Sequence, residues 1–269
     1  ATGIPDTSED DAARRRLLQE QLSRNRRFFG DGPQDAIEDA FVIVVGLGGV
    51  GSHAAHMLVR SGVANIRLID FDNVTLSSLN RHAVAVRADV GRPKAVVLAE
   101  FFHKFAPHAK VDPRVTLFEK DAADDLLAGN PAYVVDCIDD VTTKTDLLAY
   151  CHTHGLPVVS AMAAGAKADP TRIHLCDLAD TVDDPLAARV RHDLKKRGIT
   201  RGIDVVYSSE KATRKLCDLE GEAAEAPHEF GAMDNFRVRV LPVLGTTPAV
   251  FGNAAAAHVL CHLASQPFA

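Results

Sequence analysis

A glycine-rich turn between two apolar segments constrains this chain more than any other feature of its sequence. The apolar run Phe41–Val45 leads directly into GLGGVG at residues 46–51, and a second apolar run ends at Asp70, in LIDFD. Glycines let the backbone turn tightly, so that unpaired N–H groups at the start of the following helix can face a phosphate group. Asp70 is placed to accept hydrogen bonds from ribose hydroxyls. The pattern predicts a strand–helix–strand unit that binds either a nicotinamide dinucleotide or another adenine nucleotide.

Strands and helices alternate along the first 165 residues. Further strands are expected at 66–70, 111–118, 133–138 and 157–165, with helices at 51–61, 93–107 and 143–155. The continuous apolar segment YVVDCI at 133–138 is typical of a parallel strand that is covered on both faces. We therefore predict an α/β fold built on a Rossmann-like, doubly wound and mostly parallel sheet.

The pattern changes after about residue 170. Two more strands are expected at 173–179 and 204–209, on either side of a basic helix at 185–198, and a late strand at 236–244 precedes a helix at 252–264. Residues 217–234 are polar and acidic, and we expect a flexible loop there. We therefore predict three regions: an N-terminal helical arm at 1–30, a core at 31–170, and a C-terminal extension at 171–269 that completes the sheet. The helix of the arm is expected to end at Gly30.

Composition narrows the class of protein. A chain of 269 residues with 46% hydrophobic and 25% charged residues suits one large α/β domain or two small ones. No apolar run approaches the roughly 20 residues of a spanning helix, so we expect no membrane segment in this chain. Its five cysteines are scattered without a C-x-x-C pair, which argues against a zinc site and for a reducing compartment.

Three charged residues follow successive predicted strands: Arg81 in FDNVTLSSLNR, Lys94 in DVGRPK and Asp139 in DCIDD. Because the carboxyl ends of parallel strands share one sheet edge, these side chains can converge on one crevice. Attack of a carboxylate on an α-phosphate builds negative charge on oxygen and releases pyrophosphate, which suits two cations and an acid-held magnesium. A hydride-transfer site needs none of these groups. Their order and spacing also argue against a purely decorative surface role.

GLGGVG, LIDFDNVTLSSLNR, GRPK and DCIDD, over roughly residues 26–165, resemble the adenylation core of the ubiquitin-activating-enzyme-like superfamily, the ThiF and MoeB proteins. The resemblance implies that the core at 31–170 binds ATP, with the Asp70 position on the ribose, the Arg81 and Lys94 positions on the triphosphate, and Asp139 supporting magnesium. It also implies a homodimer, in which an N-terminal arginine, Arg27 or Arg26, reaches into the partner's site.

The resemblance leads to two sets of candidate residues. Catalytic roles are expected for Arg81, Lys94, Asp139 and Arg27. Nucleotide contacts are expected from the glycine-rich loop and the motifs that follow it, namely Gly46, Gly48, Gly49, Gly51, Asp70, Asp72, Ser77, Asn80, Arg81, Lys94, Asp139 and Asp140.

The second half of the chain selects a branch of the superfamily. The two C-x-x-C pairs of ThiF- and MoeB-like enzymes and the cysteine domain of larger ubiquitin activators do not occur in this sequence. Instead, the segment 160–199, DVVYSSE and FRVRVLPVLGTTPAVFG resemble the tRNA threonylcarbamoyladenosine dehydratases, particularly eukaryotic and fungal members. This resemblance implies ATP-dependent cyclisation of the modified base through an adenylylated carboxylate, releasing AMP and pyrophosphate. Bacterial members often have a cysteine at the position of Val205, so no thiol intermediate is expected here.

Basic residues cluster in two segments although the net charge is −6. Residues 12–30 carry six arginines against one acid, and residues 186–215 carry nine Lys/Arg against three acids. The second cluster, in the extension expected to face tRNA, could hold RNA phosphates; a solvated helix face is the competing interpretation. The candidates are Arg189, Arg191, Lys195, Lys196 and Arg197.

Two alternative functions use the same adenylation core: activation of the C-terminus of a ubiquitin-like or sulfur-carrier protein, and an inactive scaffold subunit. The missing zinc pairs and cysteine domain count against the first, and intact Arg81, Lys94 and Asp139 count against the second. A dehydrogenase is a more distant alternative. We expect an intracellular protein, cytoplasmic or mitochondrial, with outer-membrane association if the native termini carry an anchor.

Overall fold

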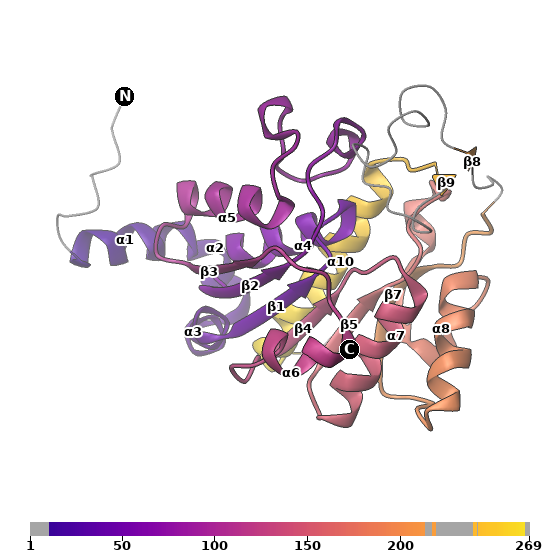
Figure 1. Ribbon diagram of the computed structural model, residues 1–269. Helices are drawn as coiled ribbons and strands as arrows, with labels where there is room; N and C mark the ends of the chain where they lie inside the picture. Colours follow the sequence, from indigo (N-terminus) through magenta and orange to yellow (C-terminus); the bar gives the residue numbers. More distant parts are fainter. Residues whose placement is uncertain (1–10, 213–216, 219–238, 241, 267–269) are drawn as a thin grey trace.

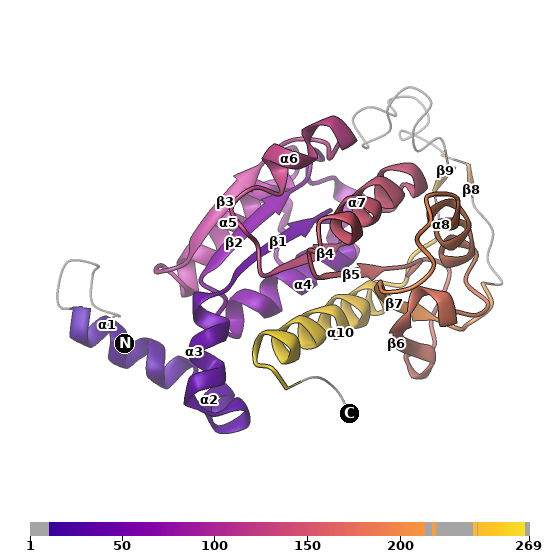
Figure 2. The same cartoon turned by 90° about the horizontal axis from the view of Figure 1, so that it is seen from below.

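The computed structural model describes residues 11–212, 217–218, 239–240 and 242–266 (Figures 1 and 2). Its centre is a seven-stranded sheet in the order β3-β2-β1-β4-β5-β7-β6. The strands are β1 (Phe41–Val45), β2 (Asn65–Ile69), β3 (Lys110–Arg114), β4 (Tyr133–Asp136), β5 (Val158–Ala161), β6 (Ile173–Asp177) and β7 (Asp204–Ser208). All neighbours pair in parallel except β6, which runs antiparallel to β7 at the sheet edge. The predicted doubly wound α/β sheet, completed by residues of the C-terminal part, is confirmed.

Helices cover both faces of the sheet. On one face lie α4 (Gly49–Arg60), α5 (Lys94–Phe105) and α10 (Thr246–Leu263), and on the other lie α6 (Ala123–Leu126), α7 (Val141–Thr153) and α8 (Pro185–Lys196) (Figure 2). Each face of the sheet packs against its helices in a separate hydrophobic core. In β1, Val42 and Val44 point into the core with α4, α5 and α10, and Ile43 and Val45 point into the core with α6, α7 and α8. Alternate residues of a strand point to opposite faces, so a strand buried on both sides must be apolar throughout.

The N-terminal region differs from its prediction. The single helix expected to end at Gly30 is two helices, α1 (Asp11–Gln21) and α2 (Ser23–Phe29), and a third helix, α3 (Asp31–Asp39), follows immediately. Gly30 has a φ of 92°, a left-handed conformation that lets the chain change direction between α2 and α3. Sequence reasoning missed α3 because Ile37 is its one large apolar residue in a polar segment. Helix α1 projects away from the body of the molecule (Figure 1).

Two predictions for the C-terminal part also need correction. The late strand expected at 236–244 is not part of the main sheet: its described strand residues are β9 (Arg239–Val240), which pairs with β8 (Cys217–Asp218) in a separate two-stranded sheet. Residues 236–238 and 241 lie outside the described residues, as do residues 219–234 of the predicted flexible loop. Helix α10 begins at Thr246 rather than at the expected Gly252. Gly252 lies inside the helix, where it packs closely on α4: a Cβ there would lie 2.4 Å from the carbonyl oxygen of Val50.

None of the helices in the described part of the chain is both long and apolar enough to cross a membrane.

Candidate nucleotide-binding site

The glycine-rich loop joins β1 to α4 in a conformation that excludes side chains from its inner positions. Gly46 has a φ of 85°, and a Cβ on it would lie 2.7 Å from the carbonyl oxygen of Cys137, which follows β4. A Cβ on Gly51 would lie 1.8 Å from the carbonyl oxygen of Gly46. At Gly48, by contrast, a Cβ would meet nothing within 4 Å. The loop is therefore packed tightly against the protein on one side and open at Gly48, beside the N-terminus of α4, where a phosphate group can approach.

Asp70, immediately after β2, braces this loop. Its Oδ2 accepts the N–H of Leu47 at 2.5 Å, and its Oδ1 accepts the N–H of Asp72 at 2.7 Å. The residue is 8% exposed, and burial raises the pKa of its carboxyl group, an effect that the positive charge of Lys94 partly offsets. A carboxylate held at the end of β2 beside a glycine-rich loop is the arrangement that binds a nucleotide ribose in doubly wound folds.

Lys94 is the first residue of α5, and its ammonium is buried beside the same strand end. Its Nζ lies 2.7 Å from Asp72 Oδ2, and the two side chains are 10% and 8% exposed. An ammonium has three N–H donors, and the bond to Asp72 uses one of them. The structure thus places a cation and two carboxylates, Asp70 and Asp72, together at the carboxyl end of β2.

Arg81 lies beside Gly49 of the glycine-rich loop. It follows the 3-10 helix η1 (Leu76–Asn80), and its Cγ and Cδ lie 3.1 Å from the position that a Cβ on Gly49 would occupy. Its Nη1 donates to the carbonyl oxygen of Ser77 and to Asn80 Oδ1, both at 2.9 Å. Ser77 Oγ also lies 3.0 Å from Thr75 Oγ1 within this segment. These contacts hold a guanidinium beside the N-terminus of α4.

Asp139 and Asp140 follow β4, whose end contacts the glycine-rich loop through Cys137. Asp140 caps α7: its Oδ2 accepts the N–H of Thr143 at 2.8 Å, so this predicted nucleotide contact has a structural bond of its own. The strand order β2-β1-β4 places Asp70, the glycine loop and Asp139 consecutively along one sheet edge. The sheet order therefore brings these segments to the same edge, and the convergence of Arg81, Lys94 and Asp139 on one nucleotide stays a prediction.

Two buried lysines at the same edge were missed by sequence reasoning. Lys144 of α7 is fully buried and binds Asp136 Oδ2 at 2.6 Å, Ser160 Oγ at 3.0 Å and the carbonyl oxygen of Ala161 at 3.0 Å, which ties β4, β5 and α7 together. The second is Lys167, whose buried Nζ binds Asp184 Oδ2 at 2.6 Å. The helical spacing of Lys144 with Leu147, Leu148 and Cys151 was a signal that could have placed it on a buried face.

The two candidate arginines of α2 have different surroundings. Arg26 forms ion pairs with Asp35 and Glu38 at 2.8 Å and with Asp31 at 3.4 Å, so it links α2 to α3 within its own chain. These acids raise its pKa. Arg27 is exposed. Of the two, Arg27 is the one whose side chain is placed to reach another molecule.

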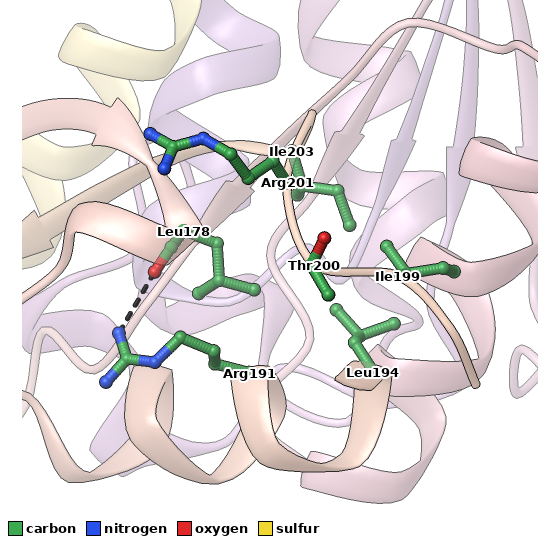
Figure 3. Close-up of a pocket in the computed structure, with 7 residues that line it drawn as sticks. All are labelled: Leu178, Arg191, Leu194, Ile199, Thr200, Arg201 and Ile203. Carbon is green, nitrogen blue, oxygen red and sulfur yellow. Dashed lines mark hydrogen bonds between the residues drawn. The ribbon is translucent and has the colours of Figure 1, made fainter. Parts of the chain in front are cut away.

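The basic helix α8 is largely tied to its own chain. Arg191 donates to the carbonyl oxygen of Leu178 at 3.1 Å (Figure 3). It also donates to the carbonyl oxygen of Thr181 at 3.1 Å and to Thr181 Oγ1 at 2.6 Å. Among the other candidates, Lys195 is exposed and the rest form ion pairs, namely Arg189 and Lys196 with Asp193 and Arg197 with Asp146.

Helix α8 also runs away from the glycine-rich loop. Its N-cap, Asp184, lies beside the carboxyl end of β7, because Lys167 Nζ binds both Asp184 and the carbonyl oxygen of Ser208. The chain after α8 returns to the start of β7, where Gly202 lies close to His152 near the end of α7. The last turn of α8 therefore lies toward the amino ends of the strands, whereas the glycine-rich loop lies at their carboxyl ends. This turn and the residue after it carry Lys195, Lys196 and Arg197.

Similarity to known proteins agrees with this geometry. The ThiF family model matches residues 22–267. A Saccharomyces cerevisiae protein, tRNA threonylcarbamoyladenosine dehydratase 2, is 44% identical over 93% of this chain, and an Escherichia coli tRNA threonylcarbamoyladenosine dehydratase is 34% identical over 90% of this chain and 92% of its own length. The crystal structure of the E. coli enzyme in complex with ATP superimposes with a TM-score of 0.79 at 31% identity, covering 96% of this chain and 97% of that one.

The chain spans 58% and 59% of the lengths of two yeast relatives that it matches. The matched region contains the glycine-rich loop, Asp70, Arg81, Lys94 and Asp139. The chain belongs to the ThiF family.

Proposed function

We propose that this chain is the catalytic region of a tRNA threonylcarbamoyladenosine dehydratase. The observation that carries the proposal is the position of Arg81 over Gly49, beside a loop that is open at Gly48 and braced by Asp70. This arrangement offers a phosphate-binding helix N-terminus, a guanidinium and a ribose-binding carboxylate in one place. The E. coli relative, whose complexes with ATP and AMP are solved, supports the assignment of the nucleotide.

The proposed reaction has two steps. An oxygen of the threonyl carboxylate on the modified base attacks the α-phosphorus of ATP, and pyrophosphate leaves. The neighbouring ureido group then attacks the activated carbonyl carbon, AMP leaves and a proton is released, so the base loses one water overall. ATP supplies the leaving groups for both steps, and the reaction needs no thiol. Val205, at the position where bacterial members often have cysteine, is fully buried in β7.

The side chains around the loop have distinct proposed roles. Asp70 would hold the ribose, while Arg81 and Lys94 would stabilise negative charge on the phosphate oxygens. Asp139 would hold magnesium. Among the described residues there is no group of three or more His, Cys, Asp or Glu side chains that could hold a metal ion. Magnesium is commonly bound by one or two carboxylates together with substrate phosphates, so one acid beside the triphosphate is a suitable donor set.

The remaining roles are also proposals. In a homodimer, Arg27 from the arm at 1–30 would complete the site of the partner subunit, while the core at 31–170 binds ATP and the extension at 171–269 faces tRNA. The basic residues of α8 stay candidates for tRNA contact away from the reacting base. A cytoplasmic or mitochondrial location stays a prediction.

The decisive test measures AMP formation from ATP and magnesium with tRNA that carries threonylcarbamoyladenosine, and with the same tRNA carrying unmodified adenosine. Mass analysis of the nucleoside should show loss of one water. Arg81→Ala should lower the rate by about 100-fold or more, because it removes a fixed positive group from the phosphate site. Arg201→Ala is the matched control, since Arg201 pairs with the exposed Asp180.

Two other outcomes would redirect the assignment. AMP formation that depends on the C-terminus of a small carrier protein, and not on the modified tRNA, would favour protein activation. Nucleotide binding without any turnover would favour a scaffold subunit.

A further inference from the structure

A cavity of about 270 Å³ lies beside the candidate nucleotide site. It is lined by two segments that are far apart in the sequence, residues 166–168 after β5 and residues 242–244 before α10. The segments are joined by two hydrogen bonds, from the N–H of Ala166 to the carbonyl oxygen of Pro242 at 2.8 Å and from Thr247 Oγ1 to the carbonyl oxygen of Lys167 at 2.9 Å. The cavity is therefore formed by the tertiary structure.

The sheet order gives the position of this cavity relative to the nucleotide site. Moving along the carboxyl edge from β2 to β1, β4 and β5, one meets Asp70, the glycine-rich loop, Asp139 and then the segment at 166–168. The other wall rests on the residue before Arg81, because Asn80 Nδ2 donates to the carbonyl oxygen of Val243 at 3.2 Å. The cavity thus adjoins the phosphate end of the site and lies on the side away from Asp70.

The wall formed by residues 166–168 is held rigidly. The side chain of Lys167 is 1% exposed, and its Nζ binds Asp184 Oδ2 at 2.6 Å and the carbonyl oxygen of Ser208 at 2.9 Å. Glu210 Oε2 accepts the N–H of Ala168 at 2.8 Å and that of Asp169 at 2.7 Å. These bonds fix both the side chain at the centre of the segment and the backbone after it.

Ala166 has a φ of 60°, a left-handed conformation that is unfavourable for a residue with a Cβ. Such conformations persist where the surroundings determine them, and they concentrate at ligand-binding sites. The bond from Ala166 to Pro242 holds the residue in this conformation. The wall is thus formed before any ligand arrives.

We propose that this cavity is the acceptor subsite, which receives the carboxylate-bearing modified adenosine. The inference rests on the proposed function and adds where the second substrate binds. Its size is close to the lower end of small-molecule sites, about 300 Å³, so it admits a nucleoside rather than a folded protein. Ala168 and Leu244 are exposed and, with Val243, give its walls an apolar surface suited to a planar base. A base held there places its threonyl carboxylate beside Arg81.

The test fills the cavity from an exposed position. Ala168 is exposed and lines the cavity, so Ala168→Phe adds bulk without disturbing the core. Ala128→Phe is the matched control, at an exposed alanine in the loop before β4. For both variants and the unaltered chain, calorimetry measures the affinity for a non-hydrolysable ATP analogue and for free N6-threonylcarbamoyladenosine. AMP formation with modified tRNA is measured in parallel.

We expect Ala168→Phe to bind the ATP analogue like the unaltered chain but to lose at least about tenfold in nucleoside affinity and in AMP formation, whereas Ala128→Phe retains both. Unchanged nucleoside affinity in Ala168→Phe would overturn the acceptor subsite, as would failure of the unaltered chain to bind the nucleoside. Absence of tRNA-dependent AMP formation despite cavity-dependent nucleoside binding would instead refute the proposed dehydration. A carrier-protein C-terminal peptide that replaces the nucleoside in this assay would overturn the identity of the occupant.

Discussion

His82 is a buried imidazole beside the nucleotide site with only one of its ring nitrogens bonded. The residue is 7% exposed, and its Nδ1 accepts the N–H groups of Ala85 at 3.1 Å and Val84 at 3.4 Å. Its Nε2 has no hydrogen-bond partner among the described residues. Burial, reinforced by the positive charges of Lys94 and His53, lowers the pKa of His82 to about 4. The ring is therefore neutral at physiological pH, with its proton on Nε2.

His82→Gln should make the stability of the protein less dependent on pH. Between the ordinary pKa of 6.5 and the folded value of about 4, the unfolded chain takes up a proton that the folded chain does not. The free energy of unfolding consequently falls by about 1.4 kcal/mol for each pH unit below 6.5, until about pH 4. Urea unfolding at pH 7 and pH 5 should show that the unaltered protein loses about 2 kcal/mol more than His82→Gln.

Other buried groups, including Asp70 and His56, also titrate but are common to both proteins, so the difference isolates His82. Parallel losses of stability between pH 7 and pH 5 would show that His82 binds a proton equally in both states.

At the scale of elements, α8 shows how a basic segment can serve the fold of its own chain. The helix begins with Asp184 as its N-cap, which accepts the N–H of Ala187 at 2.9 Å, and Pro185 occupies the first turn. Arg191 then supplies donors to the turn that ends η5 (Leu178–Asp180), at the carbonyl oxygens of Leu178 and Thr181. Part of the positive charge that suggests RNA binding therefore satisfies buried carbonyl groups instead.

Arg191→Met should destabilise the protein, whereas Lys195→Met should not. The first substitution leaves polar groups around Thr181 without their donor, at a loss of about 1.5–3 kcal/mol, while the second changes an exposed residue and should fall within about 0.5 kcal/mol. Urea unfolding of both variants checks this expectation. Equal stabilities of the two variants would show that the contacts of Arg191 contribute nothing.

The same exposed lysine tests the predicted tRNA contact. If Lys195 binds a phosphate, Lys195→Met should reduce the slope of log affinity for tRNA against log salt concentration by about 1. An unchanged slope would identify this part of α8 as a solvated face.

At the scale of the whole molecule, the order of the strands sets where each part of the proposed site lies. The proposed ribose, phosphate and acceptor positions follow one another along the carboxyl edge from β2 to β5. Arg27 lies in α2, near the N-terminal end of the chain, and α1 projects away from the body of the molecule (Figure 1). If Arg27 cannot reach the site of its own subunit, the site that it completes is that of another copy of the chain.

Mixing two inactive variants should restore activity if Arg27 acts across a homodimer. When equal amounts of Arg27→Ala and Arg81→Ala subunits exchange, half of the dimers formed are heterodimers. Each heterodimer has one of its two sites with both arginines intact. Activity should therefore recover to about a quarter of the unaltered level. AMP formation after subunit exchange measures this, with Arg81→Ala mixed with itself as the control. No recovery, with exchange verified by sedimentation of differently sized subunits, would exclude a contribution in trans.

The sequence predicted the elements around the nucleotide loop well because their determinants are local. Apolar strands, glycines and a following acid lie within 41–70, and the structure places β1, α4 and β2 there with boundaries within two residues of those expected. Predictions failed where a distant partner or a single hinge decided the outcome. The single helix expected before Gly30 breaks at Leu22, a further helix follows Gly30, and the expected late strand pairs with β8 rather than with the main sheet.

By itself, the sequence determined the fold class and which charged residues follow the carboxyl ends of the strands, since strand periodicity and glycine spacing act over neighbouring residues. Only the tertiary structure decided which cations are buried in ion pairs, that Arg191 binds carbonyl groups, and that residues 166–168 and 242–244 enclose a cavity beside Asn80. Those outcomes depend on contacts between segments far apart in the chain, which form only when the sheet and its helices are packed together.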